Sequence, residues 1–432
     1  MGVRTAREGY DVFDFDMLGL APALNDALRR IGFSQPTPIQ NQAIPLAMEG
    51  HDILGLAQTG TGKTLAFGLP LIDHLLAHPG KPAPKTVKAL ILAPTRELVN
   101  QIAESLRSLC EQTKLRVTTV VGGQSIGKQI GVLARGTDIL VATPGRLIDL
   151  MERGAVDLGS VRHLVLDEAD QMLDLGFIHA LRKIAPRLGT PRQTMLFSAT
   201  MPKQMEELSR AYLVDPRRVQ VSPPGKAADK VTQSVHFLDK AAKPSKLREI
   251  LSVDAGALTL VFARTKHGAE KLMKGLVADG FNATSIHGNK SQGQRDRAIK
   301  AFRSGDVTIL VATDVAARGI DIPGVAYVVN YDLPEVPDNY VHRIGRTARA
   351  GRAGEAIAFC ADDEVDLLRQ IEKAMKSEIP VASGTSPEPR RAENPGRRPA
   401  PARHGGKKHG PMGDRPKASG PKRRRPRHRP AA

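Results

Sequence analysis

The eight residues from Ala57 to Thr64, AQTGTGKT, follow a short apolar run and have the composition of a phosphate-binding turn. Gly60 and Gly62 let successive backbone N–H groups point at phosphate oxygens. Lys63 offers a positive charge to the terminal phosphates, Thr64 a hydroxyl to Mg²⁺, and the helix expected over 64–78 its positive N-terminal end. The alternative is a glycine-rich turn that happens to precede Lys-Thr. The stretch predicts a nucleoside triphosphate site.

Adjacent carboxylates follow the apolar run 161–166, which is expected to be a buried strand. Burial of such acids is costly unless they are paired or hold a metal. Beside a phosphate-binding turn, Asp167 is expected to hold Mg²⁺ together with Thr64, partly through water, and Glu168 to orient and deprotonate the attacking water. A solvated acidic helix cap is the alternative. We therefore predict Lys63, Asp167 and Glu168 as catalytic residues.

Two arginines later in the chain could complete such a site. Arg346 and Arg349 are three residues apart, so on a helix they would share one face and could reach the γ-phosphate as arginine fingers. The alternative is a solvated basic helix. The role of arginine finger requires a bound phosphate, and the phosphate-binding turn lies in the first half of the chain.

The elements that must position these residues alternate between apolar strands and helices, which predicts parallel sheets covered by helices. The 432-residue chain is long enough for two such domains. We expect a first lobe over 1–222, a linker over 223–230 and a second lobe over 231–382. The expected strands are 89–93, 117–121, 138–142, 161–166 and 193–197, then 258–263, 282–286, 307–311, 326–330 and 355–359, with a helix over 96–110.

The remaining residues, 383–432, have a different composition. They contain fifteen Lys or Arg against three acids, a net charge of +12 out of +18 for the whole chain. They are rich in Pro and Gly and have no aromatic residue, so they cannot bury enough surface to fold. We expect a disordered basic tail.

The rest of the composition sets limits. The two cysteines, Cys110 and Cys360, lie in apolar surroundings without the spacing of metal ligands. No run of eighteen uncharged apolar residues is present. We expect a soluble cytoplasmic protein without a membrane segment.

Taken together, the motifs resemble those of the DEAD-box RNA helicase family over about residues 13–375. Besides AQTGTGKT and Asp-Glu-Ala-Asp at 167–170, the matching segments are GFSQPTPIQ at 32–40 (the Q motif, within 13–41), PTREL at 94–98, Gly122-Gly123, TPGR at 143–146, SAT at 198–200, VFART at 261–265, TDVAARGID at 313–321 and HRIGRTAR at 342–349. Within bacteria, the two-lobed body with a basic tail resembles the RhlE-type subgroup.

This resemblance implies two tandem RecA-like lobes and assigns further roles. ATP would be bound by Phe15, Phe33, Gln40, Ala57, Gln58, Thr59, Gly60, Thr61, Gly62, Lys63, Thr64 and Asp321. RNA would be bound by Arg96, Gly123, Thr143, Arg146, Arg264, Thr313 and Asp314. Coupling between the lobes would fall to Asp170, Ser198, Thr200 and His342.

Chemistry agrees with several of these roles. The Gln40 amide can pair with one edge of adenine, which would select ATP. Guanidinium and hydroxyl donors suit the RNA backbone. The family usually has Gly where this chain has Ala348; since Ala is a small helix former, we expect the arginines to keep their geometry.

The resemblance implies an RNA-stimulated ATPase that uses ATP and Mg²⁺ to unwind short RNA duplexes. Ribosomal precursor particles and the RNA-decay machinery are candidate partners. An RNA chaperone with a vestigial ATPase is a rival, which the intact phosphate, metal and water-activating residues disfavour. A DNA helicase is disfavoured by the Q motif and by the residues 167–170.

Overall fold

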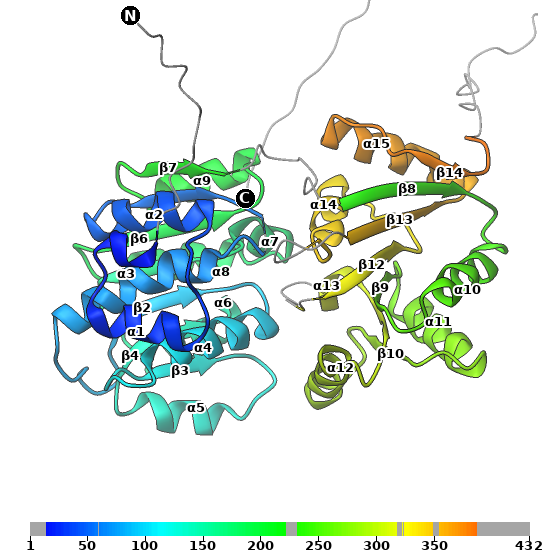
Figure 1. Cartoon of the computed structure of the whole chain (residues 1–432). Coiled ribbons are helices and arrows are strands. Elements are labelled where there is room, and N and C mark those ends of the chain that lie inside the picture. Colours follow the sequence, from blue (N-terminus) through cyan, green and yellow to red (C-terminus); the bar gives the residue numbers. More distant parts are fainter. Residues whose placement is uncertain are drawn as a thin grey trace, which may run out of the picture. The chain divides into compact units, whose positions relative to one another are not determined.

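The computed structural model describes residues 14–58, 60–221, 231–317, 322, 324–348 and 354–386 (Figure 1). The predictions for Thr59, Asp321, Arg349, the linker 223–230 and the tail from residue 387 onward lie outside these described residues. The described residues belong to one compact unit. It contains two parallel seven-stranded sheets, each flanked by helices.

The first sheet has the strand order β3-β4-β2-β5-β6-β1-β7, with all neighbours parallel. Its strands are β1 (Ile53–Leu56), β2 (Val87–Leu92), β3 (Val117–Val120), β4 (Thr137–Ala142), β5 (His163–Leu166), β6 (Gln193–Ser198) and β7 (Arg217–Gln220). Because both faces are buried, the central strands are continuous apolar runs. In β2, Ile91 packs into one core, while Leu90 and Leu92 pack into the other.

Helices cover both faces of this sheet (Figure 1). They are α1 (Pro22–Arg30), α2 (Pro38–Met48), α3 (Lys63–Ala77), α4 (Arg96–Cys110), α5 (Ile126–Leu133), α6 (Pro144–Glu152), α7 (Ala169–Asp174), α8 (Ile178–Ile184) and α9 (Lys203–Tyr212), with 3₁₀ turns η1 (Phe15–Leu18) and η2 (Ala185–Arg187). Helix α3 follows β1 directly, and α7 follows β5. Both start at the carboxyl edge of the sheet, where ligands bind in such folds.

The second sheet has the order β10-β11-β9-β12-β13-β8-β14. Its strands are β8 (Val231–Phe237), β9 (Leu258–Phe262), β10 (Ala283–Ile286), β11 (Ile309–Ala312), β12 (Val325–Asn330), β13 (Gly354–Cys360) and β14 (Val381–Ser383). Its helical elements are α10 (Lys243–Val253), α11 (Lys266–Ala278), α12 (Gln292–Ser304), α13 (Asp314–Ala317), α14 (Pro337–Ile344), η3 (Asp362–Glu364) and α15 (Val365–Met375).

The expected fold class, two RecA-like lobes, is confirmed, and each expected strand overlaps an observed one. Strands β7, β8 and β14 were not predicted from the sequence; they border their sheets or lie next to the border strand. Strand β14 carries regular structure to Ser383, one residue past the predicted end of the second lobe. No described helix is long and apolar enough to span a membrane.

The local structure of 342–349 differs from the expectation. Helix α14 ends at Ile344, so Arg346 lies in the turn beyond it and not on a helical face. Ala348 has φ 54°, in the left-handed region. The residue at position 348 must therefore adopt a left-handed conformation, and its helix propensity does not matter. Glycine suits this position because it adopts that conformation without steric penalty.

Candidate active site and nucleic-acid interface

The phosphate-binding turn joins β1 to α3. Gly62 is the N-cap of α3 with φ 92°, and no side chain caps the helix. A Cβ atom at Gly62 would lie 2.4 Å from the Gln40 amide nitrogen, so no larger residue fits here without a shift. The first N–H groups of α3 have no capping side chain and can bind an anion.

Lys63 and Asp167 meet at this turn, although more than a hundred residues separate them. The Lys63 ammonium lies 3.6 Å from Asp167 Oδ1, and the two residues are 5% and 2% exposed. Among the described residues, Lys63 Nζ has no hydrogen-bond partner. Burial raises the pKa of Asp167 to about 6, although Lys63 acts to lower it. A buried ammonium that lacks acceptors and a buried carboxylate fit a phosphate and a Mg²⁺ ion.

Glu168 is buried next to Asp167 and has φ 51°. Its backbone N–H donates to Asp167 Oδ1 at 3.0 Å. A left-handed conformation at a residue other than Gly costs on the order of 1 kcal/mol, and such residues cluster at active sites. The carboxylate thus sits where β5 turns into α7, beside the residues that would hold the phosphates.

The Q-motif residues also converge on the turn. Gln40 is buried; its Nε2 donates to Gly62 O at 2.9 Å and its Oε1 accepts from Thr37 N at 2.8 Å. The amide keeps one further hydrogen and one further lone pair for a base. The predicted aromatic residues differ: Phe15 is packed in the core, whereas Phe33 is 46% exposed.

Asp170 connects the carboxylate motif to the segment 198–200. Its Oδ2 accepts from Ala199 N at 3.0 Å, from Thr200 N at 2.8 Å and from Thr200 Oγ1 at 3.0 Å. Ser198 Oγ donates to Thr200 O at 2.7 Å. Burial acts to raise the pKa of Asp170, but His342, Lys63 and the Thr200 bonds together lower it. The predicted coupling residues are therefore in one cluster, with His342 Nε2 3.9 Å from Asp170 Oδ2.

Arg346 is buried, and its Nε donates to His342 O at 3.2 Å. A small pocket at the end of α14 is lined by Arg346, His342, Arg343 and Asp314 among others. Arg343 makes a two-point ion pair with the Asp314 carboxylate, with distances of 2.5 and 2.7 Å, and lies 4.9 Å from the centre of the Phe262 ring. The side chain of Asp314, predicted to contact RNA, thus serves an internal pair.

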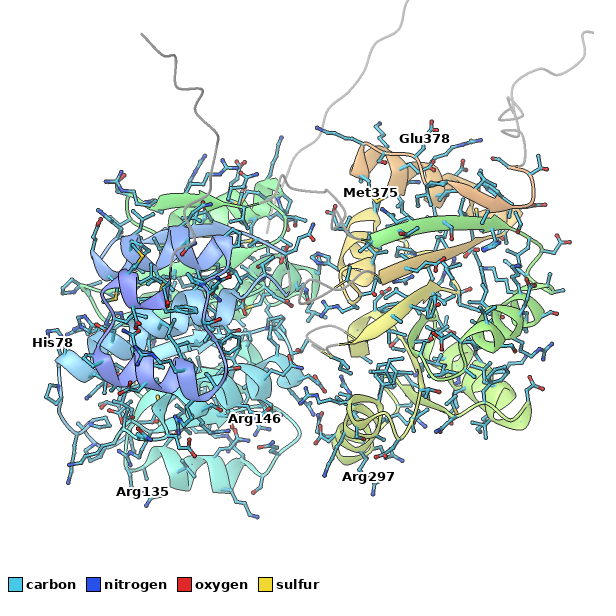
Figure 2. The ribbon with its side chains drawn as sticks, viewed as in Figure 1. His78, Arg135, Arg146, Arg297, Met375 and Glu378 are labelled. Carbon is cyan, nitrogen blue, oxygen red and sulfur yellow. The ribbon has the colours of Figure 1, made fainter. Side chains whose placement is uncertain are left out.

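Three of the predicted RNA-binding residues line one cavity of about 430 Å³. Arg96, Thr143 and Arg146 lie on it; Arg146 is labelled in Figure 2. Gly123 packs directly against Arg96, because a Cβ atom there would approach Arg96 Nη1 to 2.1 Å, and its φ is 76°. The first lobe therefore presents guanidinium groups over a glycine doublet, as contacts to a nucleic-acid backbone require.

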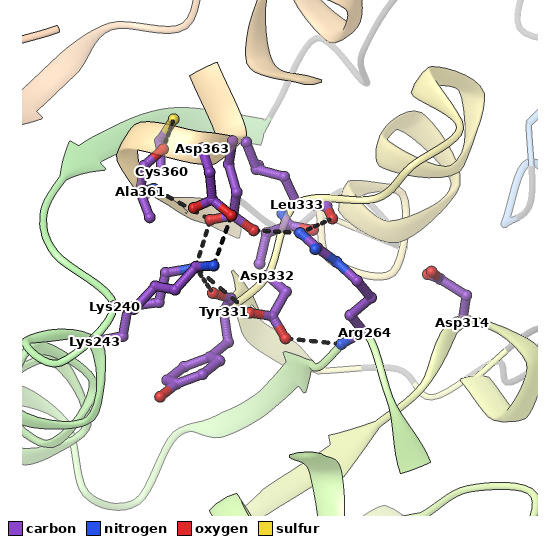
Figure 3. A network of polar contacts seen from close by, with 12 residues as sticks. Lys240, Lys243, Arg264, Asp314, Tyr331, Asp332, Leu333, Cys360, Ala361 and Asp363 are labelled. Atoms are coloured by element: carbon purple, nitrogen blue, oxygen red, sulfur yellow. Dashed lines mark hydrogen bonds and ion pairs between the residues drawn. The ribbon is translucent and has the colours of Figure 1, made fainter. Parts of the chain in front are cut away.

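The predicted RNA-binding residues of the second lobe, Arg264, Thr313 and Asp314, do not line this cavity. Arg264 belongs instead to a network of polar contacts at the end of β9 (Figure 3). Thr313 is buried at the end of β11. The structure thus brings together the first-lobe set only.

Further residues that were not predicted from the sequence lie on the same cavity. Arg295 and the apolar Leu175, Phe177 and Val315 line it. Arg295 Nη2 pairs with Glu97 Oε1 at 3.0 Å, while Gln292 contacts both Arg96 and Glu97. Gln292 and Arg295 are three residues apart in the first turn of α12, a spacing that could have indicated a shared face.

The fold and site define a P-loop nucleoside triphosphatase built from two RecA-like lobes. Family models match both lobes: "DEAD/DEAH box helicase" over residues 37–208 and "Helicase conserved C-terminal domain" over 242–351. The chain belongs to the DEAD-box family of ATP-dependent RNA helicases.

Two bacterial relatives support this assignment. The ATP-dependent RNA helicase CshA of Limosilactobacillus reuteri is 44% identical over 360 residues, which cover 83% of this chain and 71% of that one. The CshA of Bacillus licheniformis is 40% identical over 365 residues, 84% and 74% of the two chains. Because these relatives are named CshA, they support the family and not the RhlE-type subgroup specifically.

Two solved structures are similar over most of the chain. Saccharomyces cerevisiae Dbp5 bound to RNA and ADP BeF3 has a TM-score of 0.75 at 32% identity, over 85% of this chain and 95% of that one. Mss116p bound to single-stranded RNA and AMP-PNP has a TM-score of 0.80 at 29% identity, over 88% and 82%.

Proposed function

We propose that this helicase binds single-stranded RNA through contacts to the sugar-phosphate backbone and separates short RNA duplexes locally. The observation that carries the proposal is the cavity on which Arg96, Arg146 and Arg295 converge. Guanidinium groups bind phosphate oxygens with paired hydrogen bonds and carry little base information. Relatives captured with RNA and a nucleotide support the same ligand class for this chain.

ATP is the substrate at the other site. Lys63 and the N–H groups at the start of α3 would bind its phosphates, and Gln40 would read its adenine edge. Thr64 and Asp167 would hold Mg²⁺, which supplies positive charge to the phosphates when bound. Glu168, next to Asp167, would orient the attacking water and take its proton.

ATP-gated closure of the lobes would connect the two sites. Asp170 bonds to the 198–200 segment and lies near His342, so one carboxylate contacts residues from both lobes. Arg346, and Arg349 with it, would complete the phosphate site from the second lobe. If closure completes both sites, each ligand must tighten the binding of the other by the same factor.

We further propose that the protein remodels RNA in the cell, during ribosome assembly or during RNA decay. The RhlE-type assignment remains part of this proposal and rests on the two-lobed body and the basic tail.

Rates of ATP hydrolysis with single-stranded RNA, duplex RNA and DNA of matched length test the substrate. We expect strong stimulation by RNA, little by DNA, and strand separation that declines as the duplex lengthens. Equal stimulation by RNA and DNA would contradict recognition of the ribose hydroxyl. ATPase activity without any strand separation would favour the chaperone alternative.

Arg346→Ala tests closure. If the guanidinium acts as an arginine finger, the change should slow RNA-stimulated hydrolysis by about 10³-fold or more. ATP binding, measured with a fluorescent analogue, should be retained because the first lobe supplies the phosphate-binding turn. Hydrolysis at the wild-type rate would show that the second lobe does not complete the site.

A further inference from the structure

The predicted RNA-binding residue Arg264 forms an ion pair with a buried acid, Glu364. Glu364 lies in η3, directly before α15, and is 1% exposed. Its Oε1 accepts from Arg264 Nη2 at 2.5 Å, and its Oε2 accepts from Lys243 Nζ at 2.6 Å. Figure 3 labels these two cations. One carboxylate therefore bridges two cations that come from different elements, the start of α10 and the loop after β9.

Lys243 completes the base of this network. It is 2% exposed, and besides Glu364 it donates to Tyr331 O at 2.8 Å and lies 3.5 Å from Asp332 Oδ1. The ammonium thus has partners for all three of its hydrogens. Such a satisfied buried pair is rigid, because moving either partner would leave an unpaired charge in the core.

Arg264 differs from Lys243 in that part of it reaches solvent. Its side chain is 34% exposed. Its backbone N–H donates to Asp332 Oδ2 at 2.9 Å, and its Nη2 lies 3.5 Å from Leu333 O. Within the described part of the chain, its Nε and Nη1 make no hydrogen bond. One half of the planar fork is held by the protein, and the other half keeps its donors.

We propose that Glu364 is a positioning residue for RNA binding: it fixes the Arg264 guanidinium so that the uncommitted edge is held ready for a backbone phosphate. This inference rests on the proposed contact between Arg264 and RNA. A long side chain that is already ordered loses less conformational entropy on binding. Glu364 sits next to α15, so it also ties this contact to the C-terminal helix of the lobe.

Glu364 has a second, opposing influence on RNA affinity, so the direction of the change in Glu364→Gln tests the inference. A carboxylate next to a guanidinium lowers the positive potential that attracts phosphate. If neutralisation dominated, Glu364→Gln would bind RNA more tightly. If positioning dominates, the same substitution weakens RNA binding, by about three- to tenfold from the cost of ordering one long side chain.

The experiment measures the affinity of the full chain for a labelled single-stranded RNA, with a non-hydrolysable ATP analogue present. We compare wild type, Glu364→Gln, Arg264→Met and the double variant. We expect both single variants to weaken RNA binding and the double variant to be no weaker than Arg264→Met. In ATPase assays, Glu364→Gln should raise the RNA concentration for half-maximal rate more than it lowers kcat.

One further variant tests whether the planar guanidinium is needed, and another tests whether the effect is specific to Glu364. Arg264→Lys keeps the charge but has a single ammonium, which Glu364 would capture, so it should bind RNA as weakly as Arg264→Met. Asp363→Asn is the matched control, since Asp363 is the neighbouring acid, exposed and paired with the surface residue Lys240 at 2.6 Å. It should leave RNA affinity unchanged.

Loss of a buried charge could unfold the lobe, so Lys243→Met/Glu364→Gln, which removes both buried charges, is measured alongside. It should show the same weakening. Tighter or unchanged RNA binding in Glu364→Gln, or a loss that persists on top of Arg264→Met, overturns the inference while leaving the helicase function intact. Unchanged binding in Arg264→Met also overturns it, by removing the contact. Absence of RNA stimulation in wild type would instead contradict the proposed function.

Discussion

Lys63 and Asp167 form a buried ion pair whose atoms are 3.6 Å apart, too far for a hydrogen bond. The ammonium has no hydrogen-bond partner among the described residues, so the pair does not satisfy either group fully. The ammonium can therefore exchange the carboxylate for a phosphate oxygen, and the carboxylate can exchange the ammonium for a metal ion. Glu168 donates its backbone N–H to the Asp167 carboxylate and so is held next to this pair.

From this arrangement we predict different losses at Lys63 and Glu168. Glu168→Gln should retain ATP and RNA binding but lose about 10²- to 10⁴-fold in kcat, because it removes the general base. Lys63→Ala should weaken ATP binding as well. Single-turnover hydrolysis and equilibrium binding of a fluorescent ATP analogue separate the two effects. Wild-type turnover in Glu168→Gln would show that another group activates the water.

Much of the fold was predictable because apolar runs in buried parallel strands have few alternatives. Helix α4 begins and ends where the sequence analysis placed it, at Arg96 and Cys110. The missed strand β8 has polar and partly exposed positions, so its pattern lacks the continuous apolar run of central strands. Strand β14 has three exposed residues and is set by its pairing with β8.

For the site, sequence order indicated which residues matter but not their partners. Nothing near Asp314 in the sequence shows that Arg343 occupies both oxygens of its carboxylate. Similarly, Arg264 is bound by Glu364, which lies a hundred residues away in η3. Long-range ion pairs of this kind leave no local periodicity from which to predict them.

Ala348 is expected to cost the second lobe stability. Because its φ is 54°, a side chain there meets the steric penalty of the left-handed region. Ala348→Gly should therefore raise the free energy of unfolding by about 1 kcal/mol, even though glycine gains entropy in the unfolded chain. Urea denaturation of the full chain, followed by a probe in the second lobe, measures the change.

The matched control is Ala301→Gly in the interior of α12, where glycine should destabilise by roughly 1 kcal/mol. Opposite signs at the two positions would establish that backbone conformation decides the effect. A destabilising Ala348→Gly would mean that this turn tolerates Ala without strain.

His163 should make the first lobe sensitive to acid. It is 4% exposed, packs 4.3 Å from the His74 ring, and its Nδ1 lies 3.2 Å from Gln193 Oε1. Burial lowers the pKa of His163 to about 4, and it lowers the pKa of His74 as well. Because the unfolded chain takes up the proton first, stability is full above pH 6.5 and is lost as the pH falls toward 4.

For His163 the loss is at most roughly 3 kcal/mol. The measurement is the drop in unfolding free energy between pH 7.5 and 5, which should be smaller in His163→Phe than in wild type. The exposed His267 supplies the control, and His267→Gln should leave the drop unchanged. The same drop in all three proteins would place the acid sensitivity elsewhere.

The basic tail should set how strongly RNA affinity depends on salt. Its fifteen Lys or Arg residues come without any aromatic residue, which favours electrostatic tethering over base stacking. Since β14 runs to Ser383, a truncation after residue 386 keeps every described strand of the second sheet. This truncation should keep the maximal ATPase rate but require more RNA to reach it.

The salt dependence identifies the cause of that shift. On single strands, log affinity falls with log salt by roughly 0.7 per phosphate contact, so the slope should be steeper for the full chain than for the truncated chain. Affinity for one labelled RNA, measured across several salt concentrations with both proteins, gives the two slopes. At high salt the two affinities should converge. Equal slopes would show that the tail does not contact RNA and would assign its charge to an acidic partner instead.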